Sequence, residues 1–260
     1  MRVGVEMSAE APEQAGTPGF LQDPTSISRA ARAAGVGTLW ISEGRSGSPD
    51  PFPIAAAIAQ VVPDMGIGVI VRPSLGRHPA IVARDLIALD AISGGRSSIA
   101  LFDDGSGPLD AERLGEAASL MKALLTHTEV TVAGRFYQVA ELTLRPRPVR
   151  AEGPEVIAGL ASPLGLGEDT TQEEPSLLGL DGHLVVGGPP EVARCRLRLD
   201  ATAPAGRPPK VVWRGTLDKT GRWASQLGEL AEAGAQELIV VGESSSGLLG
   251  ALDTLGNLVA

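Results

Sequence analysis

Residues 65–102 read MGIGVIVRPSLGRHPAIVARDLIALDAISGGRSSIALF and hold two short apolar runs with one helical pattern between them. The first run covers residues 65–71 and the second covers residues 97–102. Between them, residues 79–92 carry an apolar stripe at helical spacing, which ends at Ser93-Gly94-Gly95. Continuous apolar runs of this length are typical of strands in a parallel sheet whose two faces are both covered. This stretch therefore predicts a parallel strand–helix–strand unit.

The same alternation continues on both sides of this unit. Strands alternating with helices favour a parallel sheet, and eight strand-like runs in one domain-sized chain favour a closed (β/α)8 TIM barrel over an open sheet. We expect a single domain over residues 1–260. The strand-like runs lie at residues 3–5, 37–42, 65–71, 97–102, 156–158, 183–186, 211–213 and 237–241, and the clearest helical patterns at 26–34, 53–62, 79–92, 110–125 and 225–233.

Two stretches interrupt the alternation. Residues 128–148 contain alternating apolar residues around Gly134-Arg135, which predicts an inserted hairpin with its tip at that pair. Residues 160–182 are rich in glycine, proline, serine, threonine and acidic residues, which predicts an irregular loop.

Composition limits the partners of this chain. A net charge of −9 repels phosphate backbones and anionic lipids, so nucleic acid and membranes are poor partners and a small-molecule substrate is expected. Cys195 is the one cysteine, which excludes a disulfide within the chain. No apolar stretch reaches the roughly 18 residues of a membrane span, and residues 1–6 lack a signal-peptide pattern. A cytoplasmic protein is expected.

Several motifs resemble the luciferase-like monooxygenase family, which contains flavin- and deazaflavin-dependent oxidoreductases. Residues 35–43 (GVGTLWISE) are similar to the family's second strand, and 77–80 (RHPA) followed by 89–96 (LDAISGGR) resembles its most recognisable signature. Residues 112–117 and 134–137 resemble the helix and hairpin that follow. The match is good over residues 35–150 and weaker beyond.

The resemblance implies a TIM barrel whose C-terminal rim binds FMN or coenzyme F420. Hydride transfer or oxygenation of a small organic substrate would follow, with the ring carrying the chemistry. The alanine- and arginine-rich composition mildly favours the deazaflavin, and the sequence leaves open whether any cofactor binds. Many family members are dimers, so the resemblance implies a homodimer.

Glu43 is the candidate catalytic residue, because it follows the second strand at the carboxyl end where barrel active sites form. It is either an acid/base or substrate anchor, or a rim carboxylate that caps a neighbouring helix. Many family members have a histidine directly after this acid, where this chain has Gly44.

The third strand carries the candidate ring-backing peptide. The resemblance implies a non-prolyl cis bond behind the cofactor ring, and by position this is Gly68-Val69. A cis bond of this kind costs about 3 kcal/mol and persists only where function or packing holds it. The alternative is a trans strand in which glycine permits close packing.

Phe102 and Asp103 end the fourth strand, where family members commonly have a glycine-rich loop. As candidate cofactor-binding positions they depart from the pattern, since side chains of this size fill space that a flavin needs.

The phosphate end of the implied cofactor is also altered. Gly159-Leu160 stands where the family has a glycine-rich turn that opens a phosphate-binding helix, and Gly187-Gly188 is a second candidate turn. Four acids between residues 163 and 179 disfavour an anion near the first turn.

The remaining polar candidates favour structural roles. His78 is expected to organise its loop, and Arg72 and Arg77 to lie on the rim, where either could meet a phosphate. No His/Cys cluster has metal-ligand spacing, and no serine stands in a hydrolase elbow.

Three functions remain open from the sequence. The first is an oxidoreductase that uses coenzyme F420 or FMN. The second is a degenerate, non-catalytic paralogue that acts as a binding or interaction protein, suggested by Gly44, Phe102 and the acidic loop. The third is a barrel enzyme that holds a metal on Glu43, Asp103 and Asp104.

Overall fold

The structure is a computed structural model, and it describes residues 1–9, 24–44, 48–103, 108–160, 179–202, 209–216, 223–242 and residue 252. Its centre is a closed barrel of eight parallel strands in the order β1-β10-β9-β8-β7-β4-β3-β2. This confirms the predicted (β/α)8 barrel. The strands are β1 Arg2–Ser8, β2 Thr38–Ser42, β3 Gly66–Val71, β4 Ser97–Asp103, β7 Glu155–Leu160, β8 Gly182–Val185, β9 Lys210–Gly215 and β10 Glu237–Val241.

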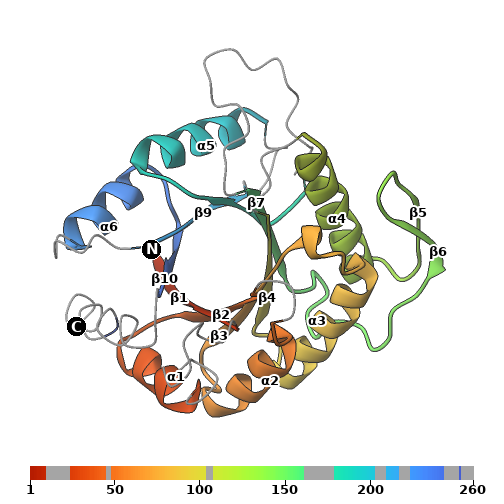
Figure 1. Ribbon diagram of the computed structural model, residues 1–260, viewed down its shortest axis with the longest axis horizontal. Coiled ribbons are helices and arrows are strands. Elements are labelled where there is room, and N and C mark those ends of the chain that lie inside the picture. The colour runs from red at the N-terminus through yellow and green to blue at the C-terminus, as the bar shows by residue number, and fades with distance from the viewer. Residues whose placement is uncertain are drawn as a thin grey trace.

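Helices surround this barrel, as Figure 1 shows. Two helices, those that begin at Pro51 and Pro79, start with a proline and a capping side chain. Asp50 accepts a hydrogen bond from the Phe52 N–H, and His78 Nδ1 accepts one from the Ala80 N–H. Gly94, at φ 69°, ends one helix in the left-handed conformation. The described helices are α1 Pro24–Ala33, α2 Pro51–Val61, the 3-10 turn η2 Pro73–Leu75, α3 Pro79–Ser93, α4 Pro108–Thr126, α5 Pro189–Thr202 and α6 Trp223–Glu232.

The barrel interior is a packed core, separate from the larger core between the strands and the helices. Side chains alternate along each strand, so every second residue points inward. The strand pairings and the stagger of an eight-stranded barrel place Glu6, Ile70, Gly159 and Arg214 in one layer near the carboxyl ends. The interior apolar cluster consists of Trp40, Ile70, Ala100, Phe102, Ile157, Leu184, Val212 and Ile239, with Val186 packed against it.

A buried lysine closes the opposite, amino-terminal end of the barrel. Lys210 Nζ donates to Glu155 Oε2 at 2.6 Å and to Glu237 Oε2 at 2.5 Å. Its side chain is 13 % exposed and that of Glu237 is 4 % exposed. Three strands, β7, β9 and β10, are therefore joined across the barrel floor.

The family-like signature of residues 89–96 stabilises the scaffold. Asp90 is fully buried and accepts hydrogen bonds from Ser97 Oγ at 2.7 Å and from the Val149 N–H at 2.8 Å. Arg96 donates to main-chain carbonyls at the end of α2, in the turn after it and at the end of α3, namely those of Ala59, Val62, Met65 and Ser93. A cation at helix carboxyl ends is favourable, so both residues lock helices to strands.

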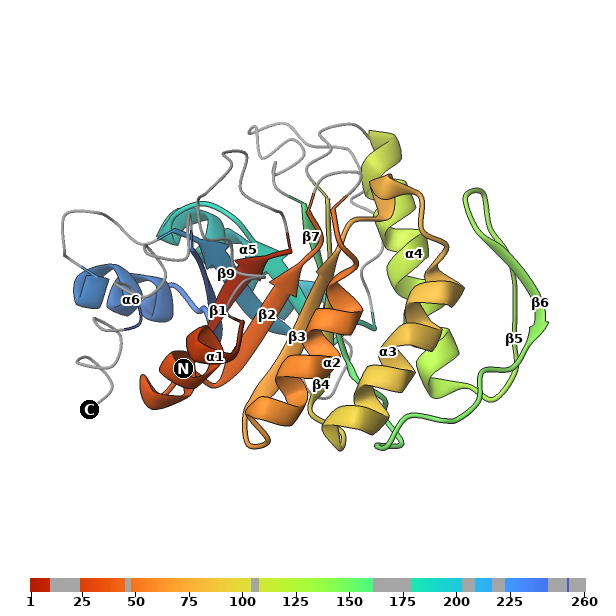
Figure 2. The same ribbon diagram turned by 60° about the horizontal axis from the view of Figure 1, so that its bottom comes forward.

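The predicted insertion corresponds to a hairpin of β5 Val130–Ala133 and β6 Gln138–Leu142. It stands beside α4, outside the barrel (Figure 2). Glu116 on α4 accepts hydrogen bonds from the N–H groups of Arg135, Phe136 and Tyr137, which fixes the hairpin tip. Most of the predicted loop 160–182 lies outside the described residues, between the end of β7 and the start of β8.

Among the helices that the structure describes, none has the length and apolar character needed to cross a bilayer.

Replacing Asp90 by alanine should lower the free energy of unfolding by about 2–4 kcal/mol, because Ser97 Oγ and the Val149 N–H lose a buried charged acceptor. Chemical denaturation measures this loss. The exposed Asp64→Asn variant is the control and should change stability by less than about 0.5 kcal/mol. Equal effects of the two variants would contradict the assigned role of Asp90.

Candidate functional site

The carboxyl ends of the barrel strands form the candidate site, here called the mouth. Active sites of such barrels lie at this end. The inward side chains of the described strands near the mouth include Glu6 on β1, Phe102 on β4 and Arg214 on β9. These three elements are far apart in sequence, and the closed sheet brings their side chains together.

An ion pair spans the mouth. Arg214 Nε donates to Glu6 Oε2 at 2.6 Å and Arg214 Nη2 donates to Glu6 Oε1 at 2.7 Å. Glu6 is 3 % exposed. The Arg214 guanidinium also stacks over the Phe102 ring, with 4.4 Å between Cζ and the ring centroid, and Phe102 is 1 % exposed. Two-pronged pairing and stacking hold the guanidinium in one orientation.

The candidate ring-backing peptide does not have the cis form. Within the described residues the cis bond is Arg145-Pro146, and Gly68-Val69 is trans. A Cβ on Gly68 would lie 2.1 Å from Trp40 Cε3, so the glycine permits the Trp40 indole to pack against β3. Val69 is fully buried in the outer core, on the helix side of the strand. Close packing, the alternative interpretation of this glycine, therefore explains it.

Glu43 lies at the rim with its carboxylate engaged. Glu43 Oε2 accepts a hydrogen bond from the Arg72 N–H at 2.9 Å, and Oε1 lies 3.6 Å from Arg77 Nη1. Because Arg72 precedes η2, this contact caps the turn after β3. Arg77 also pairs with Asp50 and Asp85. Of its two predicted roles, the contacts of Glu43 match the capping carboxylate, while a role in catalysis remains a prediction.

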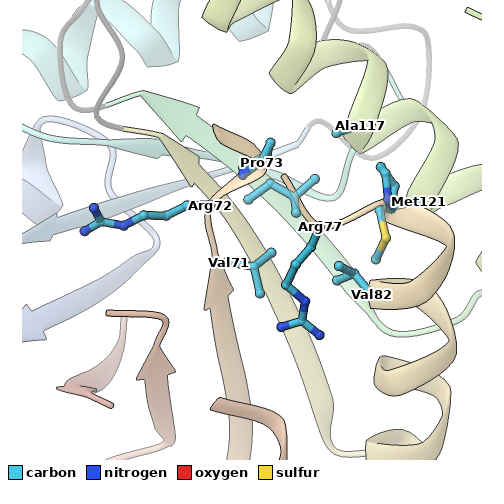
Figure 3. Close-up of a pocket in the computed structure, with 9 residues that line it drawn as sticks. Val71, Arg72, Pro73, Arg77, Val82, Ala117 and Met121 are labelled. Carbon is cyan, nitrogen blue, oxygen red and sulfur yellow. The ribbon is translucent and has the colours of Figure 1, made fainter. Parts of the chain in front are cut away.

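Arg72 and Arg77 lie on opposite sides of β3. Figure 3 shows the Arg77 side chain on the helix side, and Arg72 extending the other way. Arg72 follows Gly68 and Ile70 at an inward position, so its side chain lies on the mouth side of the barrel wall.

Asp103, the candidate cofactor-binding position next to Phe102, lies on the other face of the barrel wall. Adjacent strand residues point to opposite faces, so an inward Phe102 requires an outward Asp103. Asp103 Oδ2 accepts a hydrogen bond from the Ser74 N–H at 2.9 Å and the residue is 2 % exposed. Asp103 therefore supports η2 behind the barrel wall. Asp104 lies outside the described residues.

Gly159 lies on the inner face of β7, where a Cβ would come within 2.1 Å of the Leu184 carbonyl oxygen. That space is filled by the neighbouring strand. Leu160 ends β7 opposite Asp103. The four acids and most of the turn that follows lie outside the described residues.

The Glu191 side chain lies at Gly187-Gly188, the second candidate phosphate turn. Glu191 Oε2 accepts the Gly188 N–H at 2.8 Å, and this bond holds the pKa of the Glu191 carboxyl below its usual range. Pro189 and Pro190 bring no N–H to the first turn of α5. A phosphate would have to compete with Glu191 for the Gly188 N–H, and the phosphate-binding role of the pair stays a prediction.

The described part of the mouth does not fit a tricyclic ring in the implied position. Trp40 covers Gly68, Phe102 and Arg214 occupy the inner space, and the Gly188 donor is used. A cavity lined by Val71, Arg77, Val82 and Met121 measures about 10 Å³, room for one water molecule, and lies behind β3 (Figure 3). This cavity is far smaller than the roughly 300 Å³ of a drug-sized pocket, and it lies on the helix side of β3 and not in the mouth.

A metal on Glu43 and Asp103 has no geometric support, because their carboxylates accept backbone N–H groups, that of Arg72 before η2 and that of Ser74 within it. Within the described ranges, no group of three or more histidine, cysteine or acidic side chains could hold a metal ion.

Glu6 and Arg214 were not among the residues that the sequence pointed to. The signal was present, since each is a charged residue inside an otherwise apolar strand and near its carboxyl end. Counting which residues alternate inward would have placed both in the mouth.

This architecture defines a class: a TIM barrel with a hairpin between α4 and the next barrel strand, and a mouth built from β1, β4 and β9. The luciferase-like monooxygenase family matches residues 1–180, more than half of the chain. The chain belongs to the luciferase-like monooxygenase family.

Two curated proteins have similar sequences. The chain is 30 % identical over 151 residues to 4-hydroxyprotoasukamycin monooxygenase of Streptomyces nodosus subsp. asukaensis, covering 51 % of this chain and 40 % of that protein. It is 36 % identical over 85 residues to pyrimidine monooxygenase RutA of Agrobacterium fabrum, and this match covers 27 % of this chain and 23 % of RutA. The chain thus spans less than half the length of these curated relatives.

Solved structures share the fold over nearly the whole chain. The coenzyme F420 dependent tetrahydromethanopterin reductase from Methanopyrus kandleri has a TM-score of 0.71 at 16 % identity and covers 98 % of this chain and 97 % of its own. The oxygenating constituent of 3,6-diketocamphane monooxygenase from Pseudomonas putida, solved with FMN, has a TM-score of 0.68 at 14 % identity. The match covers 100 % of this chain and 98 % of that one. At these identities the likeness establishes the fold.

Replacing Arg214 alone by glutamine should destabilise the barrel by about 3–5 kcal/mol, because Glu6 stays buried without a counter-ion. The double variant Glu6→Gln with Arg214→Gln should lose less than the single variant, since no charge is left unpaired. Urea unfolding measures both. The single variant Glu6→Gln is measured as well, and a double variant that loses as much stability as the two single variants together would show that the pair does not act as a unit.

The Glu191 cap should give a pH-dependent contribution to stability. Its lowered pKa means that the contribution is full above about pH 5 and is lost as the pH falls through and below the usual glutamate range. The difference in unfolding free energy between wild type and Glu191→Gln should therefore be present at pH 7 and shrink towards pH 3. The exposed Glu129→Gln variant is the control. A difference that grows on acidification would rule out the cap.

Proposed function

We propose that this chain is a non-catalytic member of the luciferase-like family that acts by binding a small molecule at the mouth, without FMN or coenzyme F420. The observation that carries this proposal is the Glu6–Arg214 pair stacked on Phe102. These side chains fill the inner space from which a cofactor ring would contact the strands.

The energetic argument depends on burial. Glu6 is nearly inaccessible, so a ring that separated it from Arg214 would leave a buried charge unpaired, at a cost of about 3–5 kcal/mol. A micromolar cofactor site has about 8 kcal/mol of binding free energy. Subtracting the cost weakens such a site to roughly the millimolar range. Moving the bulk of Phe102 would weaken it further.

Other departures support the same proposal. Gly44 stands where many family members have a histidine, so this position supplies no side chain that could relay a proton. Glu43 is committed to the turn after β3, and Glu191 occupies the N–H of the second phosphate turn. The residues that match the family best, Asp90 and Arg96, stabilise the scaffold.

The second candidate is an oxidoreductase that uses FMN or coenzyme F420 on a small organic substrate. Family membership favours it, as do similar structures whose names include these cofactors. A cytoplasmic location and a homodimer remain predictions under either function.

Titration of the purified chain with FMN and with coenzyme F420, followed by absorbance and fluorescence, separates the two candidates. We expect no saturable binding below about 100 μM and no oxidation of either reduced cofactor above the rate without protein, because Phe102 and the Glu6–Arg214 pair occupy the space that a tricyclic ring needs. The FMN-binding 3,6-diketocamphane monooxygenase component is the positive control. Saturable micromolar binding with cofactor turnover would overturn the proposal in favour of the oxidoreductase.

A further inference from the structure

Arg214 has a donor edge that its ion pair leaves unused. Glu6 takes Nε and one hydrogen of Nη2, the side edge of the guanidinium. Among the described residues, Nη1 has no hydrogen-bond partner, and the Arg214 side chain is 17 % exposed. The end edge, formed by Nη1 and the second hydrogen of Nη2, therefore offers two parallel donors at the mouth.

This edge is held rigidly. The Glu6 carboxylate fixes the rotation of the guanidinium in its plane, and the Phe102 ring supports one face at 4.4 Å. Both supporting residues are themselves almost completely buried. A donor pair fixed in advance loses little conformational entropy when a ligand binds, which is the usual requirement for a precise recognition site.

The surroundings favour an anion with an apolar body. Phe102 and Ile70 line the inner face beside Arg214, and Val186 packs against the same cluster. The Arg214 guanidinium supplies the positive charge at this wall. Its end edge can hold an anion by hydrogen bonds, and the apolar side chains offer a surface to the carbon body of that anion.

We propose that the mouth binds a small organic carboxylate, with both carboxylate oxygens on the end edge of Arg214 and the carbon body against the apolar side chains. This inference rests on the proposed function, because it assigns the ligand class of the same cofactor-free mouth. The planar fork of arginine matches a carboxylate by two parallel hydrogen bonds. A compact acid occupies this edge without separating Glu6 from Arg214, which a tricyclic ring would have to do.

Calorimetric titration with benzoate tests the assignment, with benzamide as a neutral probe of the same shape and inorganic phosphate as an anion without an apolar body. The variants are wild type, the double variant Glu6→Gln with Arg214→Gln, and Arg84→Gln. The double variant removes both charges and leaves none buried and unpaired. Arg84 is 61 % exposed on α3, so its variant controls for general loss of positive charge.

We expect saturable benzoate binding to wild type and to Arg84→Gln, at least about tenfold weaker binding to the folded double variant, and none of benzamide. Phosphate should bind more weakly than benzoate, since it gains nothing from the apolar wall. Benzoate binding that is absent, or unchanged in the double variant, or matched by benzamide or phosphate would overturn the carboxylate site while leaving the proposed function intact. Saturable FMN or coenzyme F420 binding that benzoate displaces would overturn the proposed function and leave the Arg214 site standing.

Discussion

The closed barrel imposes an alternation on every strand, and most of the molecule follows from it. One side chain of each neighbouring pair faces the interior and the other faces the helices. On β4 this rule separates Phe102, which lies in the mouth, from Asp103, which supports η2. On β3 it separates Arg72 from Val71, and at the carboxyl end of β2 it places Glu43 beside Arg77. Residues that are neighbours in the sequence therefore take unrelated roles.

The same alternation separates the residues that identify the family from those that face the mouth. The motifs that identify the family, around Asp90, Arg96 and Glu116, bind main-chain groups between helices, strands and the hairpin. They preserve the shape of the barrel whatever its mouth contains. The chemistry of a barrel mouth depends on inward residues, and here these include a buried ion pair and an aromatic ring.

Much of the fold could be predicted from the sequence, because apolar runs, proline starts and glycine stops are local signals. All eight strand-like runs are barrel strands, and Gly134-Arg135 does lie at the tip of a hairpin. The site was harder to predict, since Glu6 and Arg214 are 208 residues apart and meet only through the stagger of the closed sheet. The role of Glu191 was within reach, because an acid three residues after Gly188 is the spacing of a helix cap.

The paired charges of the mouth also bear on how such a barrel can change over generations. A single substitution at position 6 or 214 leaves its partner charged and buried, so the first step away from this arrangement is the most damaging one. The two positions can drift only together, or through an intermediate that a stabilising change elsewhere has made tolerable. The pair therefore constrains positions 6 and 214 jointly: exchanging both charges together avoids the buried, unpaired charge that either single exchange creates.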